Sequence, residues 1–97
     1  MKAEQMFNCL GYTKTSKSDS EYIVYEKLET YFLDSDDIDT IRKSTFKHYI
    51  SFDLKYTTVN ASTQNHESYD GDVAKPINAM EMMAVVQQCK EIGWLDD

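Results

Sequence analysis

The sequence predicts an α+β two-layer sandwich, in which an antiparallel sheet of two to four strands carries an N-terminal and a C-terminal helix on one face. Three observations support this fold class. A segment near each end has helical periodicity, a central segment alternates apolar and polar residues, and the linking stretches are short enough for a meander. A sheet with one apolar face needs cover, which two amphipathic helices can supply. The 97 residues fit a single domain, 1–97.

The N-terminal helix is predicted over Lys2–Leu10, where apolar residues recur at helical spacing. Gly11 follows and can adopt the left-handed conformation that ends a helix. The next stretch, Thr13–Ser20, is small and polar and is therefore expected to be a loop.

Two central segments favour strands. Glu21–Leu28 is rich in β-branched and aromatic residues, and we expect both of its faces to be partly covered. Thr45–Tyr56 alternates strictly and predicts a half-buried strand. Its apolar face carries Phe46, His48, Ile50, Phe52, Leu54 and Tyr56. Thr57–Ala61 favours a further strand or a continuation of the second, but no glycine marks a tight hairpin between them.

The connecting stretches are harder to interpret. Glu29–Ser44 is expected to be a loop, although its aromatic residues would also extend a strand and its acids would also start a helical turn. Ser62–Ala74 is polar, carries the turn signal Asp70-Gly71, and is expected to lead from the sheet into the last helix.

The C-terminal helix has the most complete signals. Asn78 and Glu81 have the spacing of a capping box. Gly93 supplies the stop, so that Ile92-Gly93-Trp94 repeats the earlier pattern Leu10-Gly11-Tyr12. The apolar stripe expected to face the sheet consists of Met82, Val85, Val86, Cys89 and Ile92. Core packing is the favoured role of the methionines here, and a methionine-rich partner groove is the alternative.

The charge is strongly acidic, with 17 Asp and Glu against 10 Lys and Arg and a net charge of −7. This balance argues against direct binding to nucleic acid, whose phosphates need a cationic face. It argues equally against attraction to an anionic membrane. The sequence contains no apolar run of membrane-spanning length, and its N-terminus lacks the apolar core of a signal peptide. We therefore expect a cytoplasmic protein.

No residue pattern predicts a catalytic, cofactor or metal site. Asp34 opens an acidic run, but the fifth, sixth and twelfth positions of a calcium loop starting there hold Ile38, Asp39 and Thr45 instead of the required ligands and glycine. The run is therefore interpreted as a solvated acidic loop. Its acids are also candidates for an interaction surface, and they are Asp34, Asp36, Asp37 and Asp39.

The histidines and cysteines fit no zinc spacing. His48 is expected to be a core or edge residue with a satisfied hydrogen bond, and His66 has no assigned role. Cys9 and Cys89 are expected to be buried thiols in a reducing compartment, with a disulfide between them as the minority alternative. An enzyme that uses Cys9 with a histidine ranks last, because Cys9 lies in a short predicted helix and has no basic neighbour in sequence that would activate its thiol.

Tyrosines suggest a contact surface. The sequence has seven, and Tyr25 and Tyr49 are candidates for an outer sheet face among polar residues, where tyrosine is typical of protein interfaces. For these side chains we favour ordinary cross-strand packing over a contact surface.

The chain resembles small proteins of unknown function encoded by bacteriophages and prophages of low-GC Gram-positive bacteria. The resemblance rests on short segments that end in Leu10-Gly11-Tyr12 and Gly93-Trp94-Leu95 and on two strand segments, 23–27 and 50–53. It implies a bacterial host cytoplasm and no particular activity. Our first hypothesis is a non-enzymatic accessory protein that acts by protein–protein contact, including contact with a second copy as a homodimer. The alternative is an acidic mimic of DNA that inhibits a host nuclease or another basic partner.

Overall fold

A five-stranded antiparallel sheet and two helices make up the part of the chain that the computed structural model describes, residues 1–34, 41–65 and 72–96. The helices are α1 (Ala3–Cys9) and α2 (Ala79–Glu91). The strands are β1 (Thr13–Lys14), β2 (Tyr22–Asp34), β3 (Ile41–Asp53), β4 (Thr58–Asn65) and β5 (Val73–Ala74). Every neighbouring pair of strands is antiparallel and the spatial order follows the chain, so the sheet is a meander.

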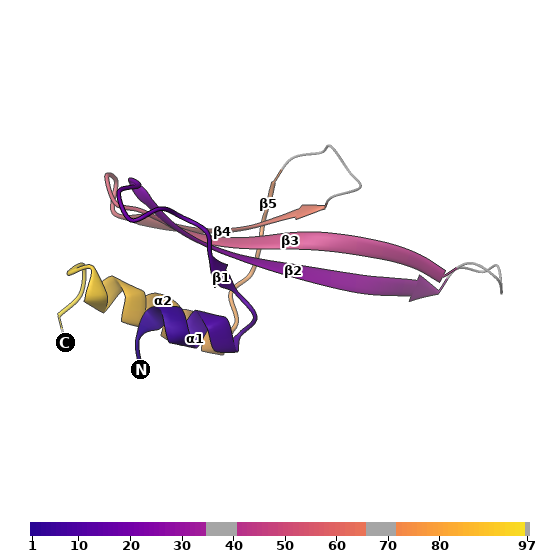
Figure 1. Cartoon of the computed structure of the whole chain (residues 1–97), viewed down its shortest axis with the longest axis horizontal. Coiled ribbons are helices and arrows are strands. Elements are labelled where there is room, and N and C mark those ends of the chain that lie inside the picture. The colour runs from indigo at the N-terminus through magenta and orange to yellow at the C-terminus, as the bar shows by residue number, and fades with distance from the viewer. Residues whose placement is uncertain (35–40, 66–71, 97) are drawn as a thin grey trace.

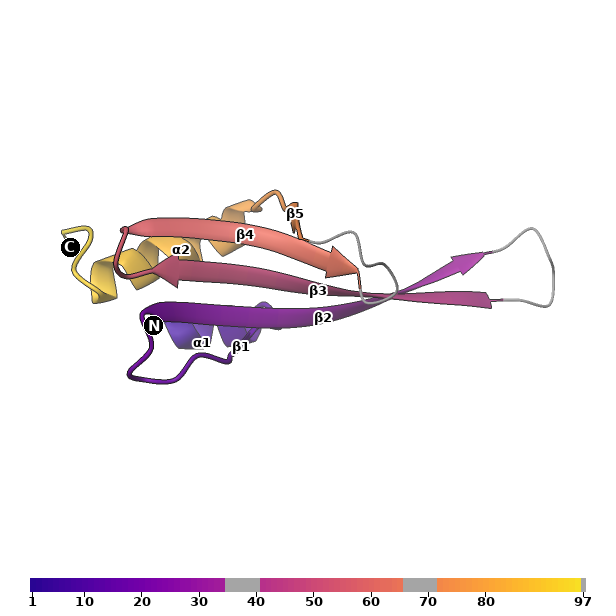
Figure 2. The same cartoon turned by 90° about the horizontal axis from the view of Figure 1, so that it is seen from above.

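Both helices cover one face of the sheet, as the sequence predicts (Figure 1). Seen from above, α1 lies beneath the side of β2 and α2 beneath the side of β4 (Figure 2). The α+β two-layer class is confirmed, whereas the strand number is five instead of two to four. The two additional strands, β1 and β5, have only two residues each and sit at the two edges of the sheet.

The register explains which side chains face the helices. Tyr25 pairs with Ile50, and Ile23 pairs with Phe52, so these residues share the inner face. The Phe7 ring of α1 stacks on the Tyr25 ring, with centroids 4.0 Å apart. Buried apolar side chains form one cluster at this contact, and they are Ala3, Phe7, Tyr12, Tyr25, Ile50, Phe52, Ala84, Val85 and Cys89.

The long strands depart from the expected loop over Glu29–Ser44. β2 continues to Asp34 and β3 begins at Ile41, so their backbones pair well beyond the helices as a two-stranded ribbon (Figure 1). β-branched and aromatic residues in this stretch favour a strand, and their signal outweighs that of the acids. Strand β4 likewise runs on to Asn65, where the sequence predicts a polar connection.

The β3–β4 turn forms without glycine. The Asp53 carboxylate accepts hydrogen bonds from the backbone amides of Lys55 and Tyr56, at 3.0 and 3.1 Å. Thr57 takes a positive φ of 58°, which is unusual for a β-branched residue. β3 therefore ends at Asp53, and Leu54 is exposed in the turn instead of facing the core.

The matched helix ends are confirmed. Gly11 and Gly93 have φ values of 92° and 84°. In each case the amide two residues beyond the helix cap returns to a carbonyl of the last turn: Tyr12 N bonds to Phe7 O at 2.9 Å and Trp94 N to Cys89 O at 2.8 Å. These are Schellman motifs, and they turn both following aromatic rings back onto the core. The capping box is confirmed too, because Asn78 Oδ1 accepts from Glu81 N at 2.8 Å.

Candidate interaction surfaces

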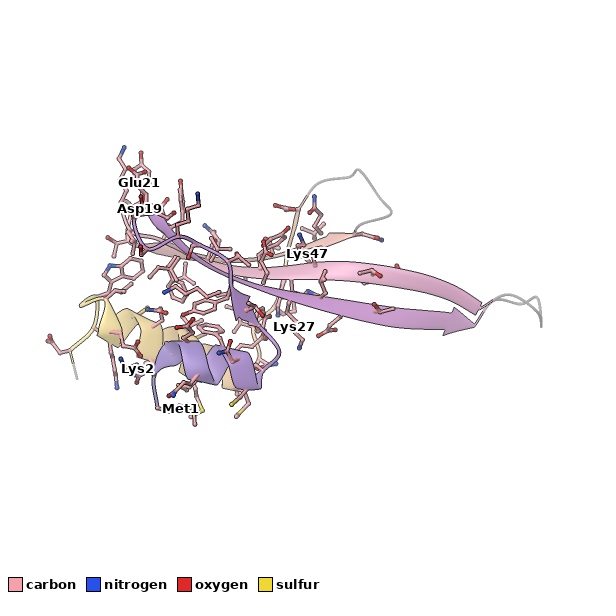
Figure 3. All side chains as sticks on the ribbon, in the orientation of Figure 1. Met1, Lys2, Asp19, Glu21, Lys27 and Lys47 are labelled. Carbon is pink, nitrogen blue, oxygen red and sulfur yellow. The ribbon has the colours of Figure 1, made fainter. Side chains whose placement is uncertain are left out.

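The free side of the helix layer carries a surface that we call the methionine surface, formed by Met1, Met6, Met80, Met82, Met83 and Val86. It contains all five methionines of the sequence. Met80 is 59% exposed and Met83 is 57% exposed, far more than apolar core residues. Figure 3 shows Met1 below the helices, on the side away from the sheet. Two helices that each hide one face in the core thus leave an apolar strip in solvent.

Two hollows mark this surface. One has a volume of about 310 Å³ and is lined by Met6, Met82, Met83, Val86, Gln87 and Lys90. The other also has a volume of about 310 Å³ and is lined by Met1, Met6, Cys9, Leu10, Met80 and Met83. They share Met6 and Met83 and therefore adjoin each other across α1 and α2.

The rotation of α2 explains why its methionines are outside. The predicted stripe is right for Val85, Cys89 and Ile92, but Met82 and Val86 are exposed. Two polar side chains take core positions instead, Glu81 and Gln88. Each is stabilised there by a tyrosine hydroxyl from the sheet side, so the amphipathic pattern alone misplaces the buried face by one position.

Gln88 is buried between α2 and the sheet. The Tyr25 hydroxyl donates to Gln88 Oε1 at 2.6 Å, and both groups are buried. Burial, together with the charges of Glu4 and Glu91, raises the pKa of Tyr25 to about 12. This hydrogen bond joins β2 directly to the C-terminal half of α2.

Glu81 anchors the start of α2. The Tyr12 hydroxyl donates to Glu81 Oε2, and Lys75 Nζ lies 3.0 Å from the same oxygen. Burial alone would raise the pKa of the Glu81 carboxyl, but the hydrogen bonds from Tyr12, the Asn78 amide and Lys75, with the Lys75 charge, hold it below its ordinary value. Burial and the bond to Glu81 raise the pKa of Tyr12 well above its usual range.

A polar pocket of about 230 Å³ opens beside this network. On its sheet side, His48 Nδ1 lies 2.8 Å from Thr63 Oγ1 and His48 Nε2 lies 3.5 Å from Glu29 Oε2. Lys27 Nζ pairs with Glu29 Oε1 at 2.8 Å. His48 therefore has the satisfied hydrogen bond that the sequence predicts. The charged groups in the pocket are engaged with one another, and this is typical of a structural network that fixes α2 on the sheet.

Neither α1 nor α2 covers the opposite face of the sheet, which we call the outer sheet face (Figure 1). Tyr49 lies there, with its hydroxyl 3.4 Å from Gln64 Oε1 and Lys47 Nζ 5.7 Å from its ring centre. Leu28, which pairs with Lys47, is 63% exposed on the same face. Figure 3 shows Lys47 on this side and Lys27 on the helix side.

Two expected placements need correction. Tyr25 lies on the inner face, 1% exposed, and not beside Tyr49 on the outer sheet face, because residues of β2 alternate and Tyr25 is paired with Ile50. Cys9 is exposed where a buried thiol is expected, whereas Cys89 is buried and its pKa is raised by burial. Both thiols are free.

The acidic run lies mostly outside the described residues. Asp34 ends β2, and Asp36, Asp37 and Asp39 fall in 35–40, as His66 falls in 66–71. Among the residues that the structure describes, no cluster of three or more His, Cys, Asp or Glu side chains could hold a metal ion. No helix in this part of the chain is long and apolar enough to cross a membrane.

No model of a protein family, no curated protein and no solved structure matches this chain.

Proposed function

We propose that this chain is a non-enzymatic accessory protein, of the phage or prophage type that it resembles, and that it works by contacting another protein through the methionine surface. The observation that supports this function is the exposure of the methionines on α2, while two polar side chains of the same helix are buried. Its core side carries Glu81 and Gln88, and its solvent side carries Met80, Met82 and Met83. A contiguous apolar surface that stays exposed lowers the solubility of a protein and is therefore rare. Where one is present, it is typical of a surface that binds another protein.

The chemistry of methionine supports the same role. Its side chain is unbranched and polarisable, and it adapts to irregular partner surfaces. The outer sheet face is the second contact surface, because Tyr49 and Leu28 lie there among polar residues. The two hollows at Met6 and Met83 favour the methionine surface as the first.

A capture experiment with three baits tests this function. Wild-type protein, the methionine variant Met80→Gln/Met83→Gln and the outer-face variant Leu28→Gln are immobilised and exposed to the same bacterial lysate. All three positions are exposed, so the folds stay comparable. We expect a partner that the wild type and Leu28→Gln retain and the methionine variant loses. Loss with Leu28→Gln alone would assign the contact to the outer sheet face, and no specific partner for any bait would contradict the proposal.

A further inference from the structure

We propose that the hollow between Met1 and Cys9 is a binding site for a soft, thiophilic metal ion, copper(I) or its chemical analogue silver(I), which sulfur atoms of both helices hold. We call this hollow the sulfur hollow. The inference goes beyond the protein contact proposed above and does not depend on it. It rests on the donor atoms that line the hollow, on their spacing along α1 and α2, and on their exposure.

The donor atoms of the sulfur hollow are almost all of one kind. Four thioethers and one thiol surround a volume of about 310 Å³, and the lining residues are Met1, Met6, Cys9, Leu10, Met80 and Met83. No carboxylate, imidazole or amine side chain is among these described residues. Thioether and thiolate ligands are soft and select copper(I), whereas calcium and magnesium take oxygen ligands and structural zinc takes thiolates and imidazoles. The lining therefore specifies the class of ion.

The spacing of the donors brings them to one place. Met6 and Cys9 are three positions apart in α1. Met80 and Met83 have the same spacing in α2. Residues i and i+3 lie on one face of a helix, and here the two faces border the same hollow. Two helices in contact thus supply two sulfur donors each, which is how metal sites are built between facing helices.

The donors can be reached from solvent. Cys9 is an exposed free thiol, and Met80 and Met83 are more than half exposed. Met6 packs partly against the core and is held in place, whereas the unbranched side chains of the exposed methionines can close around an ion. On binding, the S–H bond of Cys9 is replaced by a bond from sulfur to the metal, and the proton passes to solvent. No oxidation state changes.

The adjoining hollow provides an internal comparison. Its volume is also about 310 Å³, but it has no thiol, and the Lys90 ammonium group in its lining repels a cation. We therefore expect no metal ion there. Met82 is exposed on α2 and lines this hollow and not the sulfur hollow, so Met82→Gln is a matched control for the loss of a methionine.

Anaerobic titrations of the full chain test the site. Copper(I) is added as its acetonitrile complex in competition with the chromogenic chelator bicinchoninate, and silver(I) and zinc(II) are titrated separately by calorimetry. The proteins compared are the wild type, Cys9→Ser, Met80→Gln/Met83→Gln and the control Met82→Gln. All of these positions are exposed, and circular dichroism verifies that each variant is folded.

We expect the wild type to bind a single copper(I) or silver(I) ion, and to bind zinc(II) more weakly. Ultraviolet absorption of a copper–thiolate bond should accompany copper(I) and be absent from Cys9→Ser. Cys9→Ser and Met80→Gln/Met83→Gln should each lose about tenfold or more in affinity, because even the loss of a residue that only supports a metal ligand has an effect of this size. Met82→Gln should bind as the wild type does.

Three results would overturn the site. These are an unchanged affinity in Cys9→Ser or in Met80→Gln/Met83→Gln, an equal loss in Met82→Gln, and zinc(II) binding as tight as that of copper(I). Failure of this proposal is distinguishable from failure of the proposed function. A partner captured from lysate by a chain that binds neither copper(I) nor silver(I) would leave the contact function standing and refute the metal site, and ion binding without any captured partner would do the reverse.

Discussion

Glu81 accepts hydrogen bonds from three separate parts of the chain. Its Oε1 atom accepts from the Asn78 amide and from Lys75 Nζ, both at 3.1 Å, and its Oε2 atom accepts from the Tyr12 hydroxyl. The side chain is almost completely buried, so a carboxylate without these donors would be costly there. The start of α2, the segment before it and the segment after α1 are thus held at one point.

Replacing this carboxylate should weaken the fold in a pH-dependent way. The pKa of Glu81 in the folded protein is lowered, so its stabilising contribution is complete above the ordinary carboxyl pKa of about 4.3 and is lost as pH falls through the folded-state pKa. We expect Glu81→Gln to reduce the free energy of unfolding by about 2 kcal/mol at neutral pH. Urea unfolding at neutral pH and at about pH 3 measures this difference.

The control is Glu21→Gln, because Glu21 is exposed and should change stability by less than about 0.5 kcal/mol. The difference in the free energy of unfolding between wild type and Glu81→Gln should become smaller in acid. A gap of the same size at both pH values would show that the ionised carboxylate is not its source.

The sequence could not predict these burial choices. Glutamate and glutamine usually lie on the exposed side of a helix. The tyrosine hydroxyls that bind Glu81 and Gln88 are 69 and 63 residues away in sequence. Helical periodicity depends only on local spacing, so it includes Met82 and Val86 in the buried stripe. The methionine surface follows from that rotation and is visible only once Tyr12 and Tyr25 are placed.

At the scale of elements, the two helix stops were predictable because they depend on local backbone geometry. Gly93 has a φ of 84°, and a Cβ atom at this position would meet no heavy atom within 4 Å. The cost of Gly93→Ala should therefore be backbone strain alone, about 1–2 kcal/mol. Equilibrium unfolding in urea measures it.

Gly93→Asn is the matched comparison. Asparagine enters the left-handed region more readily than alanine, so this variant should fall between Gly93→Ala and the wild type. Stability that is unchanged in Gly93→Ala would argue that α2 can end without the left-handed residue. An equal loss in both variants would point to contacts of the new side chains instead of strain.

The strands were less predictable than the helices. The period of two over Phe46–Phe52 identified the inner face correctly, and the register confirms it. The lengths were wrong because the acids near Asp34 are poor strand formers by propensity, while cross-strand pairing over Tyr22–Asp34 decides the outcome. Turn chemistry at Asp53 and Thr57 also replaces the glycine that the usual hairpin signal requires.

For the whole molecule, the buried core and the β2–β3 ribbon occupy different ends of an elongated body, 54 Å along its longest axis (Figure 1). The core lies at the paired residues Ile23–Phe52 and Tyr25–Ile50, beneath which both helices pack. β4 reaches only as far as the partner of Phe46, so beyond this point β3 pairs with β2 alone in the described part of the sheet. The ribbon should therefore contribute little to global stability.

Replacing residues 31–44 with an Asn-Gly turn tests that separation. Thr30 and Thr45 are opposite each other in the register, so a short turn can join them. We expect thermal unfolding to shift by less than about 5 °C, on the order of 1 kcal/mol for a domain of this size. The deletion removes Asp34, Asp36, Asp37 and Asp39 while leaving the methionine surface complete. Unfolding of the shortened chain would contradict the separation of core and ribbon. A captured partner that is lost with the ribbon and kept by Met80→Gln/Met83→Gln would favour the DNA-mimic alternative, because the acids and not the methionines would then carry the contact.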